Sequence, residues 1–254
     1  MATRSLRLLA AIAGCALLAS VPVSPQGSRP DPVATFSILG YDPQTGEVGG
    51  AVQSRVFAVG NGVLWAEADV GIVTTQAIVD VSYGPKGLAL LRAGMTPEAI
   101  VKALLDSDPD PGYRGQPWPK AGRQFAVMDA KGKYAVHTGP EATPWAGHKT
   151  GTFCTAQGNI LAGEPVVTDM VTAFEKAEGH LSLRLMAALD AGQAAGGDKR
   201  GMQSAAMLIV KKNGGVWLNN DVVLRVQVDE ASQGDPLKEL RRVVEYWNAR
   251  QRRR

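Results

Sequence analysis

The order of the apolar runs along this chain is the feature that most constrains its fold. Runs rich in β-branched and aromatic residues, joined by Pro, Asp and Gly, predict β-hairpins at residues 35 to 52 and 123 to 138. Strands are also expected on both sides of the Asn213-Gly214-Gly215 turn. Single strand-like runs lie at residues 71 to 77 and 151 to 157. The chain therefore contains several antiparallel strand pairs.

Segments with helical spacing separate these strands. The clearest helix start is Thr96-Pro97-Glu98, where Thr can cap, Pro suits the first helical position and Glu lies near the positive end of the helix dipole. Helices are expected at residues 82–94, 96–105, 164–177 and 181–191, and from residue 235 onward. Because strands and helices come in separate blocks, the pattern predicts an α+β fold rather than a parallel βαβ sheet. The Pro- and Gly-rich stretch from 106 to 122 is a long loop, either functional or a simple insertion.

The N-terminal segment is typical of an export signal. Arg4 and Arg7 precede an apolar stretch from Leu8 to Ala19, which is short for a membrane span. Cys15 follows Ile12-Ala13-Gly14 in a pattern like a bacterial lipobox, so either ordinary signal cleavage or a lipid anchor at Cys15 fits. The expected domains are a signal or lipoprotein signal (1–24), a flexible Pro-rich spacer (25–34), one domain (35–248) and a basic tail (249–254). The mature protein is expected to be periplasmic or extracellular.

Charge and cysteine content exclude several classes of protein. The formal net charge is +3, but residues 238 to 254 hold seven Lys and Arg against two Glu, so the body of the chain is slightly acidic. A nucleic-acid-binding surface would need a basic stripe on that body, and none is expected. Cys154 is the only cysteine after the signal segment, so no internal disulfide is expected, and its apolar context predicts a buried, inert thiol.

Common catalytic motifs are missing from the sequence, which contains no HExxH, CxxC or GxSxG. Three scattered histidines do not predict a metal site, and no cofactor is expected. One sufficient alternative is a Thr or Ser at a processed N-terminus, where the α-amine accepts the hydroxyl proton. The opening strand begins with such a residue, Thr35.

Polar residues interrupt the apolar pattern at a few further places. Gln76 lies within an apolar strand, Arg55 closes another, and Asn159 follows the Cys154 strand. The loop from Gly192 to Ser204 is rich in Gly and presents four polar side chains together, namely Asp198, Arg200, Gln203 and Ser204. It is neither a Walker loop nor a Rossmann loop, since no GK[ST] follows and its glycines come after a helix. A solvated turn with Gly helix caps explains the loop equally well.

Seven segments in order resemble the bacterial domain-of-unknown-function 1028 family. They are Thr35–Ile38, Ser54–Gly60, Gly71–Ala77, Tyr83–Leu88, Trp145–His148, Gln157–Gly163 and Ala191–Ala205. The resemblance covers the chain from Thr35 to about Tyr246. It implies a four-layer αββα sandwich similar to the N-terminal-nucleophile (Ntn) hydrolases, with no assigned function.

Two hypotheses for function remain open. In the first, an exported Ntn-type amidohydrolase cleaves a small amide or acylated amino compound with Thr35 as nucleophile. Asn159 or a Gly-rich backbone would stabilise the oxyanion, and Arg55 and Arg200 would bind a substrate carboxylate. Gln76, Asp198 and Gln203 would orient Thr35 or the substrate, with Ser204 beside them. In the second, the protein is a non-catalytic periplasmic binding or assembly protein on the same fold.

Each of these residues also has a purely structural explanation. Thr35 can be an ordinary strand residue, Arg55 and Asp198 can form a structural ion pair, and Asn159 and Gln203 can be hydrogen-bonded turn amides. Homo-oligomerisation is compatible with either hypothesis. The two hypotheses share a small-molecule substrate or ligand and differ in whether the Ala34–Thr35 peptide bond is cut.

Export is the first testable consequence of the sequence. Cells that express the full chain should release it in the periplasmic or membrane fraction, because Arg4, Arg7 and the apolar stretch form an export signal. Fractionation followed by intact-mass measurement tests this expectation. A cytoplasmic protein that retains Met1 would contradict it.

Overall fold

The computed structural model describes most of the chain after the predicted spacer. The described residues are 35–110, 112–113, 115–142, 145–214, 222–229 and 234–252. The signal segment and spacer predicted for residues 1 to 34 lie outside this part, as do residues 253 and 254 of the predicted tail.

A six-stranded antiparallel sheet forms the larger of two sheets. Its strand order is β10-β9-β2-β1-β8-β7, so β1 is a central strand with neighbours on both sides. The strands are β1 (Thr35–Asp42), β2 (Glu47–Ser54), β7 (Ala146–Gly151), β8 (Cys154–Asn159), β9 (Ser204–Val210) and β10 (Val222–Val228). The hairpin predicted from residues 35 to 52 is confirmed as β1 and β2.

A four-stranded antiparallel sheet lies against it. The order is β3-β4-β5-β6, formed by β3 (Leu64–Glu67), β4 (Gly71–Ala77), β5 (Arg123–Asp129) and β6 (Tyr134–Thr138). The expected hairpin of residues 123 to 138 is confirmed as β5 and β6.

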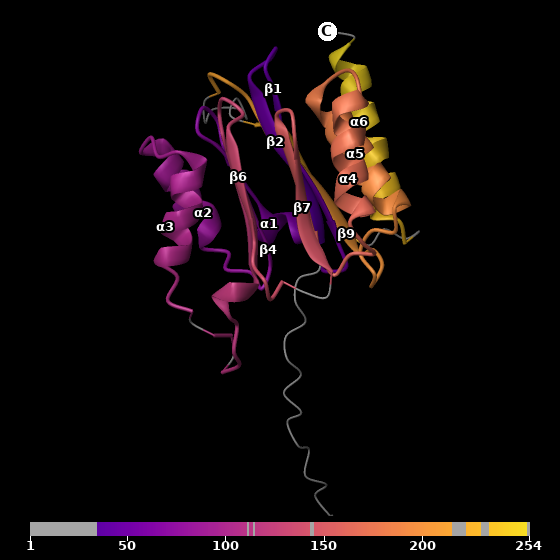
Figure 1. Ribbon diagram of the computed structural model, residues 1–254. Helices are drawn as coiled ribbons and strands as arrows, with labels where there is room; N and C mark the ends of the chain where they lie inside the picture. The colour runs from indigo at the N-terminus through magenta and orange to yellow at the C-terminus, as the bar shows by residue number, and fades with distance from the viewer. Residues whose placement is uncertain are drawn as a thin grey trace, which may run out of the picture.

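Helices cover the outer face of each sheet, which completes a four-layer αββα sandwich (Figure 1). The six-stranded sheet carries α4 (Pro165–Lys176), α5 (Leu181–Ala194) and α6 (Pro236–Gln251). The four-stranded sheet carries α2 (Tyr83–Arg92) and α3 (Pro97–Asp106). The short α1 (Val59–Val63) contacts both sheets, and a 3₁₀ turn, η1 (Lys120–Gly122), precedes β5. The α+β architecture predicted from the sequence is therefore confirmed.

The helix boundaries follow local sequence signals. The Thr96 side chain accepts a hydrogen bond from the Ala99 amide at 3.3 Å, and Asp235 caps α6 through the Lys238 amide at 3.0 Å. Helix α6 continues to Gln251, so the first residues of the predicted basic tail are helical. Among the described residues, none of the helices combines the length and apolar composition that a bilayer-spanning helix needs.

One predicted strand is wrong in its bounds. The run from 151 to 157 straddles a turn: β7 ends at Gly151, and β8 starts at Cys154. Phe153, in the turn, has a φ of 59°, a left-handed conformation that a bulky residue rarely adopts, and its ring packs edge-on against Tyr41 with centroids 5.5 Å apart. The strands β3 and β7 and the helix α1 were not expected from the sequence.

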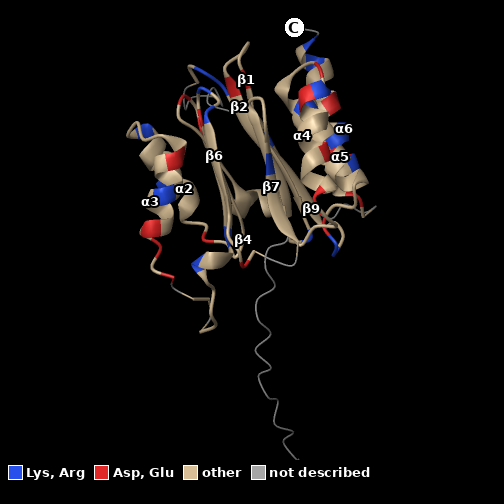
Figure 2. Cartoon of the chain, viewed as in Figure 1, with Lys and Arg blue, Asp and Glu red and all other residues tan. Residues whose placement is uncertain are grey.

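Charged residues lie mainly on the helices and connections, and the strands carry few of them (Figure 2). The layer between the two sheets is instead apolar at one end and polar at the other. Leu39, Ile72 and Met128 form part of the apolar end, all 0 % exposed. The residues at the polar end are neutral amides and hydroxyls, and they form the site described in the next subsection.

A buried ion pair ties the loop before β5 to the smaller sheet. The Arg123 Nε donates to Asp108 at 2.9 Å, and both side chains are almost fully buried. Tyr83 also donates its hydroxyl to Asp108 at 2.6 Å. Burial alone would raise the pKa of Asp108, but hydrogen bonds from Tyr83, Arg123 and the Asp110 amide outweigh it and hold that pKa below its ordinary value.

Asp108→Asn should destabilise the protein by about 3 to 5 kcal/mol, because it leaves the Arg123 charge buried without a counter-ion. Tyr83→Phe, which removes one hydrogen bond, should cost about 1 kcal/mol. Since the folded-state pKa of Asp108 is lowered, its stabilisation is present above the unfolded-state value of about 3.9 and is lost as the pH falls through the folded-state value. Urea unfolding at pH 7 and pH 3 measures both effects. Equal losses for the Asp108→Asn variant at the two pH values would contradict this account.

Candidate functional site

A row of polar residues crosses the six-stranded sheet at the N-terminal end of β1. Strand register places Thr35 opposite Ser54 on one side and Asn159 on the other, and Ser54 opposite Ser204. All four residues are 0 % exposed. Successive side chains of β1 point to opposite faces of the sheet. Phe36 and Ile38 pack in the core beneath the helices. Leu39 packs between the two sheets, so Thr35 and Ser37 also point into that layer.

The Thr35 hydroxyl is held within this row. Its Oγ1 donates to Ser54 Oγ at 3.1 Å. On β9, the Ser204 hydroxyl donates to Val56 O at 2.6 Å and accepts from the Val59 amide at 3.0 Å. Ser204 therefore fixes the connection from β2 to α1, a structural contact that the sequence did not predict.

Amide side chains from both sheets face this row. Gln76 on β4 accepts from the Ser37 hydroxyl at 2.6 Å and donates to the Thr35 carbonyl at 3.4 Å and to Gln124 Oε1 at 2.8 Å. Gln157 Nε2 donates to the Ser37 hydroxyl at 2.7 Å. The buried amides therefore join the two sheets directly, and Gln76 contacts Thr35 through its backbone carbonyl.

The direction of each amide follows from the groups around Gln124. Its Nε2 lies 3.1 Å from Gly147 O and 2.9 Å from Gly158 O, and carbonyl oxygens can only accept. The nitrogen of Gln124 must face them, so its Oε1 accepts from Gln76 and from Asn159 Nδ2 at 3.1 Å. The amide network has one consistent arrangement.

Asn159 belongs to the same network, but only its nitrogen has a hydrogen-bond partner among the described residues. Its Nδ2 donates one of two hydrogens to Gln124, whereas its buried Oδ1 has no hydrogen-bond partner in the described part of the chain. A buried acceptor without a partner costs about 1 to 3 kcal/mol, so such atoms often mark functional positions. Asn159 can therefore both donate to an oxyanion and accept from an amine beside Thr35.

In the loop before β9, Asp198 forms its ion pair with Arg200 and not with Arg55. Asp198 is 3 % exposed and pairs with the side chain of Arg200, whose Nη2 lies 3.2 Å from Asp198 Oδ2. Arg55 contributes only its backbone amide to Asp198, at 3.2 Å, and its exposed guanidinium reaches Met202 O at 3.5 Å. Gln203 donates its backbone amide to Ser54 O at 2.9 Å. Of the two arginines, Arg55 is the better placed to bind a substrate carboxylate.

The remaining reactive side chains lie at the margin of the site or outside it. Thr138 Oγ1 is 2.9 Å from His148 Nδ1 and accepts from Gln124 at 3.0 Å, so His148 extends the amide network to the surface. Burial lowers the pKa of His148, and burial together with the His148 charge lowers that of His137. The described residues contain no group of three or more His, Cys, Asp or Glu arranged to hold a metal ion.

Cys154 is buried, as the sequence predicted. It is 0 % exposed, and burial together with the negative charge of Glu175 raises the pKa of its thiol to about 12. A thiol with that pKa is protonated at neutral pH and is a poor nucleophile.

Sequence analysis missed several members of this network. Gln124, Ser37 and Thr138 were not singled out, although Gln124 carries the same signal as Gln76, a polar amide inside an apolar strand. Gln76, Asn159 and Thr35 are brought together as expected. The positions of these residues are now defined, and their chemical roles stay predictions.

Fold and site together define an αββα sandwich with a buried polar cluster at the N-terminal end of a central strand. A family model described as a family of unknown function, DUF1028, matches residues 35–240. The chain belongs to this family. It is similar to a crystal structure of protein SPO2555 from Silicibacter pomeroyi, of the same family, with 30% identity, a TM-score of 0.72 and coverage of 84% of this chain and 85% of that chain. No curated protein matches.

Gln124→Leu should destabilise the fold by at least about 3 kcal/mol, because it removes the hydrogen bonds from Gln124 Nε2 to Gly147 O and Gly158 O and those that Gln124 Oε1 accepts from Gln76 and Asn159. Gln44→Leu, a change of the same kind at an exposed position, should cost less than about 0.5 kcal/mol. Chemical denaturation of the two variants gives the comparison. A loss at Gln124 no larger than that at Gln44 would show that the amide network does not hold the sheets together.

Proposed function

We propose that the protein is an Ntn-type amidohydrolase whose nucleophile is Thr35, freed by cleavage of the Ala34–Thr35 peptide bond. The observation that carries the proposal is the polar cluster around Thr35. It contains a hydrogen-bonded hydroxyl and, opposite it, Asn159 Oδ1, which has no hydrogen-bond partner among the residues that the structure describes. Strand ends that place polar groups between two packed sheets suit catalysis, because the surrounding layers hold each group rigidly. The substrate class is a small amide or acylated amino compound.

The proposed reaction uses the chain's own groups in two steps. Thr35 Oγ1 attacks the amide carbonyl carbon while the α-amine of Thr35 accepts the hydroxyl proton. The carbon–nitrogen bond then breaks, the leaving amine takes that proton, and the acyl group remains on Oγ1 as an ester. The same amine then deprotonates a water molecule, which attacks the ester carbon. The bond between that carbon and Oγ1 breaks, Oγ1 takes the proton back from the amine, and the acyl group leaves as a carboxylic acid. The remaining hydrogen of Asn159 Nδ2 stabilises the oxyanion in both steps.

Neighbouring residues have supporting roles in this scheme. Asn159 Oδ1 accepts a hydrogen from the amine and so directs its lone pair toward Oγ1. Gln76 fixes the Thr35 carbonyl, and the exposed Arg55 binds a substrate carboxylate. Asp198 holds the Arg55 amide, Arg200 neutralises Asp198, and Gln203 and Ser204 position the connection around β2.

Burial of Thr35 favours a second candidate function. Thr35 is 0 % exposed, and a pocket of about 820 Å³ opens near the opposite end of β1. A non-catalytic binding or assembly protein on the same fold would show these two features without any cleavage before Thr35. Under either function we propose that the protein acts outside the cytoplasm on a small molecule.

The mature N-terminus separates the two functions. For the enzyme, N-terminal sequencing of exported protein should find a species that starts at Thr35. Its amide hydrolysis should rise with pH through the ordinary pKa of an α-amine, about 8, because only the neutral amine accepts a proton. Thr35→Ala should abolish turnover, Thr35→Ser should retain part of it, and Thr150→Ala, at an exposed position on β7, should retain all of it.

Two results would contradict the enzyme. One is exported protein in which no species starts at Thr35. The other is equal turnover by wild type and Thr35→Ala across an amide library screened by mass spectrometry. Ligand binding without turnover, unaffected by Thr35→Ala, would support the binding protein.

A further inference from the structure

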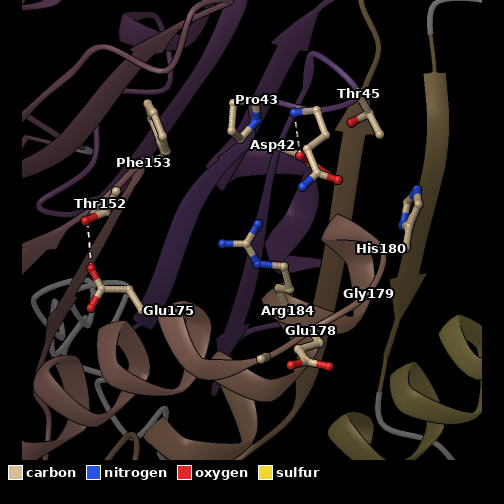
Figure 3. Close-up of a pocket in the computed structure, with 12 residues that line it drawn as sticks. Asp42, Pro43, Thr45, Thr152, Phe153, Glu175, Glu178, Gly179, His180 and Arg184 are labelled. Atoms are coloured by element: carbon tan, nitrogen blue, oxygen red, sulfur yellow. Dashed lines mark hydrogen bonds between the residues drawn. The ribbon is translucent and has the colours of Figure 1, made fainter.

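The pocket at the far end of β1 has the chemistry of a second ligand site. It encloses about 820 Å³ between three connections: the β1–β2 turn, the β7–β8 turn and the segment between α4 and α5 (Figure 3). Strand β1 runs from Thr35 to Asp42, which lines the pocket, and the seven steps between these two residues correspond to roughly 23 Å. It therefore lies apart from the amide network, and its occupation does not depend on the proposed hydrolysis.

Arg184 provides the positive group of this pocket. Its guanidinium carbon lies 4.2 Å from the centre of the Phe174 ring, and its Nε donates to Phe174 O at 3.4 Å. The two Nη atoms have no hydrogen-bond partner among the described residues, and the guanidinium extends into the space toward Asp42 (Figure 3). A guanidinium fixed by its stem with both Nη groups free is arranged to bind a carboxylate through two hydrogen bonds.

Three carboxylates line the same pocket. Asp42 is only 8 % exposed, and its Oδ1 accepts from the Gln44 amide at 2.9 Å. Glu175 Oε1 accepts from the Thr152 amide at 2.7 Å (Figure 3). In each of these two acids the second carboxylate oxygen has no partner in the described part of the chain. The exposed Glu178 has no partner there for either oxygen. The pocket therefore has more negative than positive groups.

The spacing of these acids excludes a single small cation as the occupant. The described residues include no group of three or more His, Cys, Asp or Glu that could hold a metal ion, so the three carboxylates do not converge on one point. His180 is already held, since its Nδ1 accepts from the Ser182 amide at 3.1 Å and its Nε2 faces Glu47 at 3.1 Å. The acids are better matched by an elongated ligand with separated ammonium groups.

An apolar wall completes the pocket. Phe153, in the strained β7–β8 turn, lines it, and the residue is 39 % exposed. An exposed ring beside acids suits the aliphatic part of a side chain that carries an ammonium group at its end.

We infer that this pocket binds a short basic peptide with a free carboxylate, of the size of a dipeptide that begins with lysine. The carboxylate pairs with Arg184, the two ammonium groups pair with the acids at Asp42, Glu175 and Glu178, and the lysine methylenes lie on Phe153. The volume of the pocket is in the range of ordinary small-molecule sites.

Isothermal titration calorimetry with three matched peptides tests this inference on the full exported chain. Lysyl-alanine should bind at least about 10-fold more tightly than lysyl-alanine amide, which lacks the carboxylate, and than alanyl-alanine, which lacks the side-chain ammonium. Equal affinity for lysyl-alanine and its amide would overturn the inference, as would no binding of lysyl-alanine at 10 mM, roughly the weakest affinity that such contacts predict.

Paired variants locate the binding. Arg184→Met keeps an apolar stem over Phe174 and should remove the preference for the free acid, whereas Lys176→Met changes the net charge equally outside the pocket and should keep it. Glu178→Gln should weaken lysyl-alanine at least about threefold, and Glu245→Gln, exposed on α6, should not.

The two pairs of variants separate a loss of ligand contacts from a loss of folding. Glu178 is exposed, so Glu178→Gln keeps the inference falsifiable even if Arg184→Met fails to fold. Equal effects within either pair would overturn the assignment to this pocket.

Discussion

The contact between the two sheets around β1 is the constraint on which the rest of the structure depends. Strand β1 is hydrogen-bonded on both edges and buried on both faces, so every polar group it carries needs a partner inside the protein. Ser37 and Thr35 find theirs in amides and hydroxyls from both sheets. Only one orientation of these amides gives each of them hydrogen-bond partners. The hydrogen bonds that allow polar side chains to be buried between the sheets therefore also fix the position of one sheet on the other.

This arrangement separates two kinds of chemistry along a single strand. At its first residue, neutral groups surround a hydroxyl in a dry interior, where a small change in position alters reactivity strongly. At its last residue, Asp42 lines an open pocket that also carries Arg184, Glu175 and Glu178. Dry, rigid surroundings favour covalent chemistry, and a charged, open pocket favours reversible binding. The two proposals can therefore be true together or fail separately.

The sequence predicts those parts of the fold whose determinants are local. Thr96-Pro97 starts α3, and the turn after Asp42 joins β1 to β2, because capping and turn residues act within a few positions. The β7–β8 turn was missed because its Phe153 has a left-handed backbone and packs on Tyr41, a residue distant in the sequence, and no local signal marks either feature. In the site, Gln76 was recognisable as an amide in an apolar strand. The pairing of Arg200 with Asp198, and the pocket around Arg184, depend on segments that meet only after folding.

A glycine in the middle of β1 links strand and pocket. A Cβ at Gly40 would lie 2.6 Å from two ring carbons of Phe174, so α4 can approach the sheet this closely only because residue 40 has no side chain. The Phe174 ring in turn supports the Arg184 guanidinium. A methyl group added at residue 40 would thus push the Phe174 ring outward and displace the Arg184 guanidinium that lies on it. The absence of a side chain at residue 40 therefore sets where the Phe174 ring lies and, through it, where the Arg184 guanidinium is held.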